Sequence, residues 1–182
     1  MTTTIIGKGP SLLTLTRDEV PPGRVIALNQ AIVHVRRLGL SNQIFTTQRD
    51  GCVAQDWRAA PIQNLCGHCP AGDMIMPQHP EILIVTRDTS PYCFADYSPR
   101  MVLGSFDLPW YTMSSPIAVL VAQSWGETDL FMVAHDSYTG GNTQYVNPDG
   151  SFTDHPHGGY HNAGAEAARF AELAGMTVAW RA

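Results

Sequence analysis

The chain lacks any long run of apolar residues. Its longest apolar stretches, such as 117–122, are far shorter than the roughly 20 residues that cross a bilayer. The N-terminal segment also lacks the basic region and the long apolar stretch of a signal peptide. We therefore expect a cytoplasmic protein without a transmembrane segment.

Charge is also scarce. Only 15% of the 182 residues are charged, and the formal net charge is −5. A general nucleic-acid binder needs a basic surface to neutralise phosphates, so the sequence argues against nucleic acid as a partner. With 44% hydrophobic residues, the composition predicts one globular domain over 1–182. A small anionic ligand held by one loop remains compatible with this charge.

Apolar runs typical of strands alternate with helical patterns along the chain. Such alternation predicts an α/β fold with a doubly wound, mostly parallel sheet and helices on both faces. The segment 50–80 is expected to be an irregular insertion, 88–108 to be irregular, and 137–160 to form a lid-like segment. The expected strands are 3–6, 25–28, 43–47, 81–86, 129–134 and 177–180, and the expected helices are 29–37, 114–126 and 162–175.

The first expected strand ends in the turn Gly7-Lys8-Gly9-Pro10-Ser11. Glycines let the backbone turn sharply and approach a ligand closely, and Pro10 suits the first turn of a helix. The amides of this turn, together with Lys8, would favour an anion such as a phosphate. The third glycine of a dinucleotide fingerprint and the ending of a P-loop are both missing. An ordinary tight strand-to-helix turn is therefore the alternative.

Polar residues also follow the other expected strands and open one of the helices. In a doubly wound sheet, ligands bind beyond the carboxyl ends of the strands. Amide, hydroxyl and carboxylate groups gathered there suit the phosphate, ribose and base of a nucleotide. The residues concerned are Asn29, Ser114, Ser115 and Asp136.

The order of these motifs resembles the bacterial lipooligosaccharide sialyltransferases, which use CMP-sialic acid, and the wider Rossmann-like group that shares their G-N-G-P-S-L opening. The resemblance covers both ends of the chain but not the middle, from about 51 to 108. It rests on Ile5 to Leu12, on Asn29-Gln30, on Ser115 to Gly126, on Asp136-Ser137-Tyr138 and on His157 to His161.

The resemblance implies a glycosyltransferase that moves a sugar from a nucleotide-activated donor to an acceptor hydroxyl, without a catalytic metal. His161 occupies the position of the general base that deprotonates the acceptor. Tyr138 and Tyr145 correspond to the tyrosines that stabilise the departing phosphate, Tyr145 with a slip of one residue. Asn29 would contact the nucleotide, and Ser114 or Ser115 would lie near the phosphate or the sugar carboxylate.

The chain departs from the family pattern at two informative positions. Lys8 replaces the asparagine of the opening motif, and Ala134 replaces a glycine two residues before Asp136. Two other functions stay open: a nucleotide-binding module without catalysis, and a transferase of pyrophosphate or phosphoryl groups that needs Mg²⁺. A homo-oligomer is also possible.

Four cysteines in a chain without an export signal favour thiols or metal ligands over disulfides. Cys66 and Cys69 have the C-x-x-C spacing of a zinc knuckle, and Cys52 and His79 flank them. These side chains could form a structural zinc site with three cysteines and one histidine, which would order a segment poor in apolar periodicity. Because no second C-x-x-C pair is present, thiols without metal are the alternative.

Overall fold

The computed structural model describes the two ends of the chain and short parts of its middle. These residues are 1–47, 83–87, 100–103, 114–139, 144–147, 149–154 and 163–181. The structure below is that of these residues. For 83–87 and 100–103 it is described at the level of the backbone.

A parallel sheet of seven strands forms the centre of the fold, with the order β5-β4-β3-β2-β1-β6-β9. Every pair of neighbouring strands in this sheet is parallel. The central strands are continuous apolar or β-branched runs because both faces of the sheet are covered. The strands are β1 (Thr2–Ile6), β2 (Arg24–Leu28), β3 (Gln43–Thr47), β4 (Leu83–Arg87), β5 (Arg100–Leu103), β6 (Asp129–Val133) and β9 (Thr177–Trp180).

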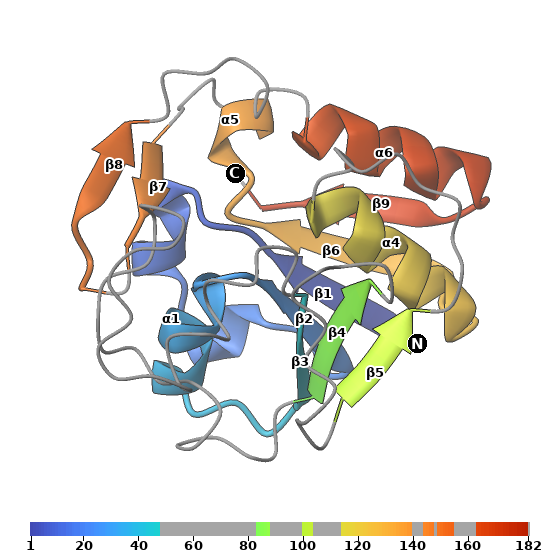
Figure 1. The fold of residues 1–182 in the computed structure, drawn as a ribbon, viewed down its shortest axis with the longest axis horizontal. Helices are drawn as coiled ribbons and strands as arrows, with labels where there is room; N and C mark the ends of the chain where they lie inside the picture. The colour runs from blue at the N-terminus through green and yellow to red at the C-terminus, as the bar shows by residue number, and fades with distance from the viewer. Residues whose placement is uncertain are drawn as a thin grey trace.

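Helices cover both faces of the sheet (Figure 1). On one face, α1 (Ala31–Arg37) and the short 3₁₀ helix η1 (Pro10–Thr14) share a core with β1 and β2. On the other face, α4 (Ser114–Ser124) and α6 (Ala163–Leu173) pack in a second core. The remaining elements are η2 (Arg17–Glu19), α5 (Asp136–Thr139) and an antiparallel hairpin of β7 (Gln144–Val146) and β8 (Phe152–Asp154).

The second core depends on close packing of α6 against α4. Gly164, Ala167 and Ala171 are buried along one stripe of α6, and residues at this spacing share one face of a helix. Small side chains there allow the two helix backbones to approach. Most of α4 is buried, including 115–119, because the helix packs both on the sheet and against α6.

The structure confirms the α/β fold expected from the sequence, with a parallel sheet and helices on both faces. Gly126 and Gly175 have positive φ and end α4 and α6, as expected. The first helix ends at Arg37 as expected but begins at Ala31, two residues later than expected, because Asn29 adopts a left-handed turn with φ of 50°. The expectation that 88–108 is irregular was also wrong, since β5 lies within it. The segment 137–160 contains the hairpin, and the insertion 50–80 lies outside the described residues.

Candidate functional site at the carboxyl edge of the sheet

The strand order places a topological switch point between β1 and β6. From β1 the chain runs to η1 on the α1 face, whereas from β6 it runs to α5 and α6 on the opposite face (Figure 1). Two connections that leave in opposite directions open a crevice beyond the carboxyl ends of their strands, and ligands of open α/β sheets bind there. The glycine turn follows β1 at this point, and Ala134-His135-Asp136 follows β6.

The glycine turn packs directly on the exit of β6. The Gly7 amide donates to the Val133 carbonyl and the Gly9 amide to the Ala134 carbonyl, both at 2.8 Å. A Cβ on Gly7 would overlap the Ala134 carbonyl oxygen. The close approach that the glycines permit is therefore an approach to β6.

Asp136 supplies the negative charge beside this turn. Its carboxylate accepts a hydrogen bond from the Ser11 hydroxyl at 2.8 Å and from the Ser11 amide at 3.3 Å. A Cβ on Gly9 would overlap the same carboxylate. Pro10 has no amide hydrogen. The amides of Gly7, Gly9 and Ser11 thus face protein acceptors, unlike the phosphate cradle that the sequence led us to expect.

Lys8 connects three parts of the edge. Its ammonium donates to the Gln30 side-chain carbonyl at 2.7 Å and lies 4.8 Å from the centre of the Tyr145 ring. The Lys8 carbonyl accepts a hydrogen bond from the Val146 amide at 2.8 Å, which ties β7 to the turn. Gln30 is absent from the sequence-predicted site residues, although it was visible as the second residue of the Asn-Gln pair after β2.

Asn29 and Ser114 meet where β2 ends and α4 begins. The Ser114 hydroxyl is 3.5 Å from the Asn29 side-chain carbonyl. The backbone amide of Asn29 donates to the Thr47 backbone carbonyl at the end of β3. The positive φ of Asn29 belongs to a region that asparagine enters more readily than most residues. The structure therefore brings together two of the residues for which the sequence predicted nucleotide contacts.

Ser115 and His135 form a buried pair, with exposed fractions of 5% and 7%. His135 Nε2 lies 3.2 Å from the Ser115 hydroxyl, and His135 Nδ1 lies 2.9 Å from the Val133 carbonyl. Burial lowers the pKa of His135 to about 4, against a smaller rise from the Val133 hydrogen bond and the charge of Asp136. The imidazole is therefore neutral near pH 7. Sequence reasoning placed His135 at the strand end but gave it no role.

Aromatic rings cover this pair from the side of β9. Trp180 meets the His135 ring edge-on at 5.7 Å between centroids, and Tyr138 packs on Trp180 at 4.6 Å. Tyr138 remains 42% exposed. The two tyrosines predicted to act on one phosphate thus have different neighbours, since Tyr145 lies over Lys8.

Ala134 has a backbone conformation that suits glycine. Its φ is 57°, in the left-handed region that costs other residues about 1–2 kcal/mol. Strained backbone positions cluster at functional sites, and this one directly precedes His135.

Arg181, which sequence reasoning missed, ties the end of β9 to the glycine turn. Its guanidinium donates to the Ser11 carbonyl at 3.0 Å, to the Thr14 carbonyl at 3.3 Å and to the Glu19 carboxylate at 2.9 Å. Hydrogen bonds from the Thr16 amide and hydroxyl lower the pKa of Glu19, and the hydrogen bond from Arg181 to the Glu19 carboxylate lowers it further. The turn is thus held from β6 by Asp136 and from β9 by Arg181.

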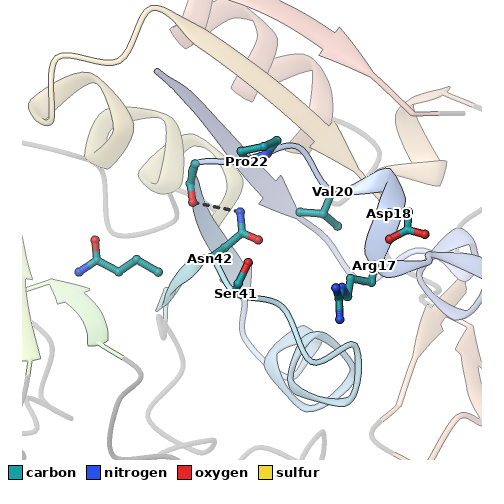
Figure 2. Close-up of a pocket in the computed structure, with 8 residues that line it drawn as sticks. Arg17, Asp18, Val20, Pro22, Ser41 and Asn42 are labelled. Carbon is teal, nitrogen blue, oxygen red and sulfur yellow. Dashed lines mark hydrogen bonds between the residues drawn. The ribbon is translucent and has the colours of Figure 1, made fainter.

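A separate hollow of about 460 Å³ opens on the opposite side of the sheet, at the amino ends of its strands (Figure 2). It lies where β2 and β3 begin, and the Asn42 amide there donates to the carbonyls of Pro21 and Gly23 at 3.0 Å. Arg17 and Asp18 give it one charge of each sign. None of the sequence-predicted site residues lines this hollow.

Several predicted residues lie outside the described part of the chain: His161, Cys52, Cys66, Cys69 and His79. Among the residues that are described, no group of three or more His, Cys, Asp or Glu could hold a metal ion. In the same part of the chain, every helix is too short or too polar to cross a bilayer. A comparison of the chain with protein-family models, curated proteins and solved structures finds no match.

Proposed function

We propose that the chain binds a nucleotide-activated sugar at the carboxyl edge of its sheet and transfers the sugar to an acceptor hydroxyl. The observation that carries this proposal is the gathering of polar side chains at the switch point between β1 and β6. They come from loops and helix starts far apart in the sequence: Lys8, Asn29, Gln30, Ser114, Ser115, His135, Asp136 and Tyr145.

Lys8 is the residue that would attract the phosphate of the donor. The amides of the glycine turn face protein acceptors, so the ammonium, rather than the backbone, supplies positive charge there. Asn29 and Gln30 lie beside it and offer amide groups for a ribose or a base. The departure from the family at Lys8 therefore has a physical role in the proposal.

The transfer step follows the resemblance to the sialyltransferases. His161 would accept the proton of the acceptor hydroxyl while the acceptor oxygen attacks the sugar carbon, with inversion at that carbon. Tyr138 and Tyr145 would donate to the departing phosphate. The donor would be CMP-sialic acid or a related nucleotide sugar.

Thermal-shift and calorimetric titrations with CMP, CDP, UDP, GDP and ATP, each with and without Mg²⁺, test the binding step. One lysine–phosphate contact contributes about 1.5–3 kcal/mol, so Lys8→Ala should weaken the best nucleotide about 10- to 100-fold. Arg17→Ala is the matched control, because it removes one cation at the opposite edge, beside the hollow of Figure 2. Binding by none of the nucleotides, or an equal loss in both variants, would contradict the proposal.

Turnover is tested separately with CMP-sialic acid and a panel of glycan acceptors. His161→Ala should retain nucleotide binding and lose transfer. Nucleotide binding with no transfer by the unmodified chain would favour a binding module without catalysis. Stabilisation by ATP only with Mg²⁺ would favour phosphoryl or pyrophosphoryl transfer.

A further inference from the structure

The contact between His135 and the Val133 carbonyl fixes the direction of the hydrogen bond between Ser115 and His135. A carbonyl oxygen can only accept, so the 2.9 Å contact to the Val133 carbonyl places the hydrogen of the neutral ring on His135 Nδ1. His135 Nε2 then carries a lone pair. At 3.2 Å from this nitrogen, the Ser115 hydroxyl is the donor.

Ser115 is therefore left with lone pairs only. We propose that Ser115 accepts a hydrogen bond from a hydroxyl or amino group of the bound ligand, and that the phosphate or carboxylate of the ligand lies elsewhere on this edge. This inference rests on the proposed function, since it takes the ligand to lie at the carboxyl edge. It replaces the sequence-based expectation that Ser115 lies near a phosphate or carboxylate.

The surroundings of His135 hold this polarity in place. Asp136 directly follows His135, and its negative charge favours protonation of the His135 ring. Trp180 from β9 covers one side, the exposed Tyr138 from α5 packs on Trp180, and the backbone of Gly7 closes another side. Burial outweighs the carboxylate and keeps the pKa near 4.

An anion at Ser115 would take the Ser115 hydrogen, and the buried Nε2 lone pair would then lose its donor unless His135 took up a proton from solvent. With a pKa of about 4, this protonation is disfavoured by a factor of about 1,000 at pH 7. A neutral donor meets no such barrier. The edge is thus divided, with the anion beside Lys8 and a neutral hydroxyl or amino group at Ser115.

The same two side chains have the arrangement of a nucleophile and its base. A buried imidazole with so low a pKa is a weak base, however, because the charged form that it must adopt is desolvated. In a catalytic triad, a carboxylate beside the imidazole stabilises the imidazolium. Here His135 Nδ1 faces the neutral Val133 carbonyl instead. The pair is suited to binding more than to nucleophilic attack.

Nitrogen-15 NMR of the histidine rings tests the polarity directly. We expect His135 to be neutral at pH 7 with its hydrogen on Nδ1. His34 is the internal control, because its Nε2 lies 2.8 Å from the Asn147 carbonyl and its hydrogen should be on Nε2. A hydrogen on Nε2 of His135, or a charged His135 ring at pH 7, would overturn the inference.

Calorimetry with CMP, CMP-sialic acid and inorganic phosphate tests the ligand class. Ser115→Ala should weaken at least one of the two hydroxyl-bearing probes about 10-fold, and Ser115→Thr, which keeps the hydroxyl, should restore it. Binding of inorganic phosphate should be unchanged in both variants. An equal loss for phosphate, or no loss for either nucleotide, would overturn the inference.

Failure of the proposed function gives a different result. If neither CMP nor CMP-sialic acid binds the unmodified chain, the nucleotide-sugar proposal falls. The inference is then decided by adding inorganic phosphate at pH 7 during the NMR measurement. With phosphate bound, as calorimetry detects it, a neutral His135 whose Nε2 keeps its hydrogen bond supports it, and loss of that hydrogen bond or proton uptake by His135 overturns it.

Discussion

Replacing Gly9 with alanine should destabilise the protein mainly through its contact with Asp136, with the Ala134 carbonyl as a second close neighbour. Gly9 has φ of −68° and ψ of 162°, a conformation open to any residue, so no dihedral strain is expected. The added methyl group would instead overlap the Asp136 carboxylate and push it from its hydrogen bonds to Ser11. Hydrogen bonds to a charged group contribute about 1.5–3 kcal/mol to the free energy of unfolding. Alanine restricts the unfolded chain more than glycine does, which raises the free energy of unfolding by about 0.4–1 kcal/mol. We expect a net loss of about 1–2 kcal/mol.

A double-mutant cycle isolates this contact. In an Asp136→Ala background the carboxylate is gone and the Ala134 backbone carbonyl is the close neighbour that remains, so Gly9→Ala should cost clearly less than in the unmodified chain, by more than about 0.5 kcal/mol. The assay is urea unfolding at equilibrium, with the slope m checked for constancy. Gly7→Ala is the control, because its methyl group would meet the Ala134 backbone carbonyl, which Asp136→Ala leaves in place. Additive effects of Gly9→Ala and Asp136→Ala, within about 0.5 kcal/mol, would refute the reasoning.

Three further predictions concern the same region. Ala134→Gly should lower the free energy of unfolding by less than about 0.5 kcal/mol, because glycine relieves the positive φ. Ala27→Gly, at a fully buried site in β2, is the control and should lower it by about 1.5 kcal/mol in urea unfolding. Equal losses in the two variants would contradict the strain at Ala134. Since the pKa of His135 falls from 6.5 in the unfolded chain to about 4 in the fold, stability present above pH 6.5 is lost as the pH falls toward 4. Between pH 6.5 and 5 the unmodified chain should lose about 1.5 kcal/mol more than His135→Gln, and parallel pH profiles would argue against a buried neutral imidazole. Gly164→Ala should cost about 1–2 kcal/mol, because its methyl group would overlap Tyr138, and an unchanged urea midpoint would show that α5 can move away.

The sequence was sufficient to predict the α/β fold, because buried parallel strands give continuous apolar runs and the helices between them keep their own period. Gly126 and Gly175 marked the ends of their helices correctly, since only a residue without Cβ takes the left-handed conformation there without cost. β5 was missed because Arg100–Leu103 is short and lies between polar, proline-rich segments. Short strands are defined by the neighbour with which they pair, which a local pattern does not contain.

The sequence indicated the edge of the sheet for the candidate site and several of its residues, but not Gln30, His135 or Arg181 and not the contacts among them. The strand ends identified Lys8, Asn29, Ser115 and Asp136, because parallel strands collect their carboxyl ends at one edge. The partner of each group depends on contacts between residues far apart in the chain. Asp136 therefore appeared as a nucleotide contact, whereas in the fold it accepts hydrogen bonds from Ser11.

The proposed zinc site stays a prediction, since Cys52, Cys66, Cys69 and His79 lie outside the described residues. Metal analysis of the purified protein is the measurement that decides it. One equivalent of zinc, lost together with structure on chelation, is the expected result. A metal-free protein that melts at the same temperature with and without chelator would favour thiols without metal.

The hydrogen bonds of Arg181 to the Ser11 and Thr14 carbonyls have a consequence for protein synthesis. They join residues separated by 170 and 167 positions, so the glycine turn is synthesised long before the arginine that supports it. During translation, β1 and the turn leave the ribosome before Arg181 has been added. A chain released before Arg181 would therefore carry every strand that precedes it and still present an unfinished candidate site.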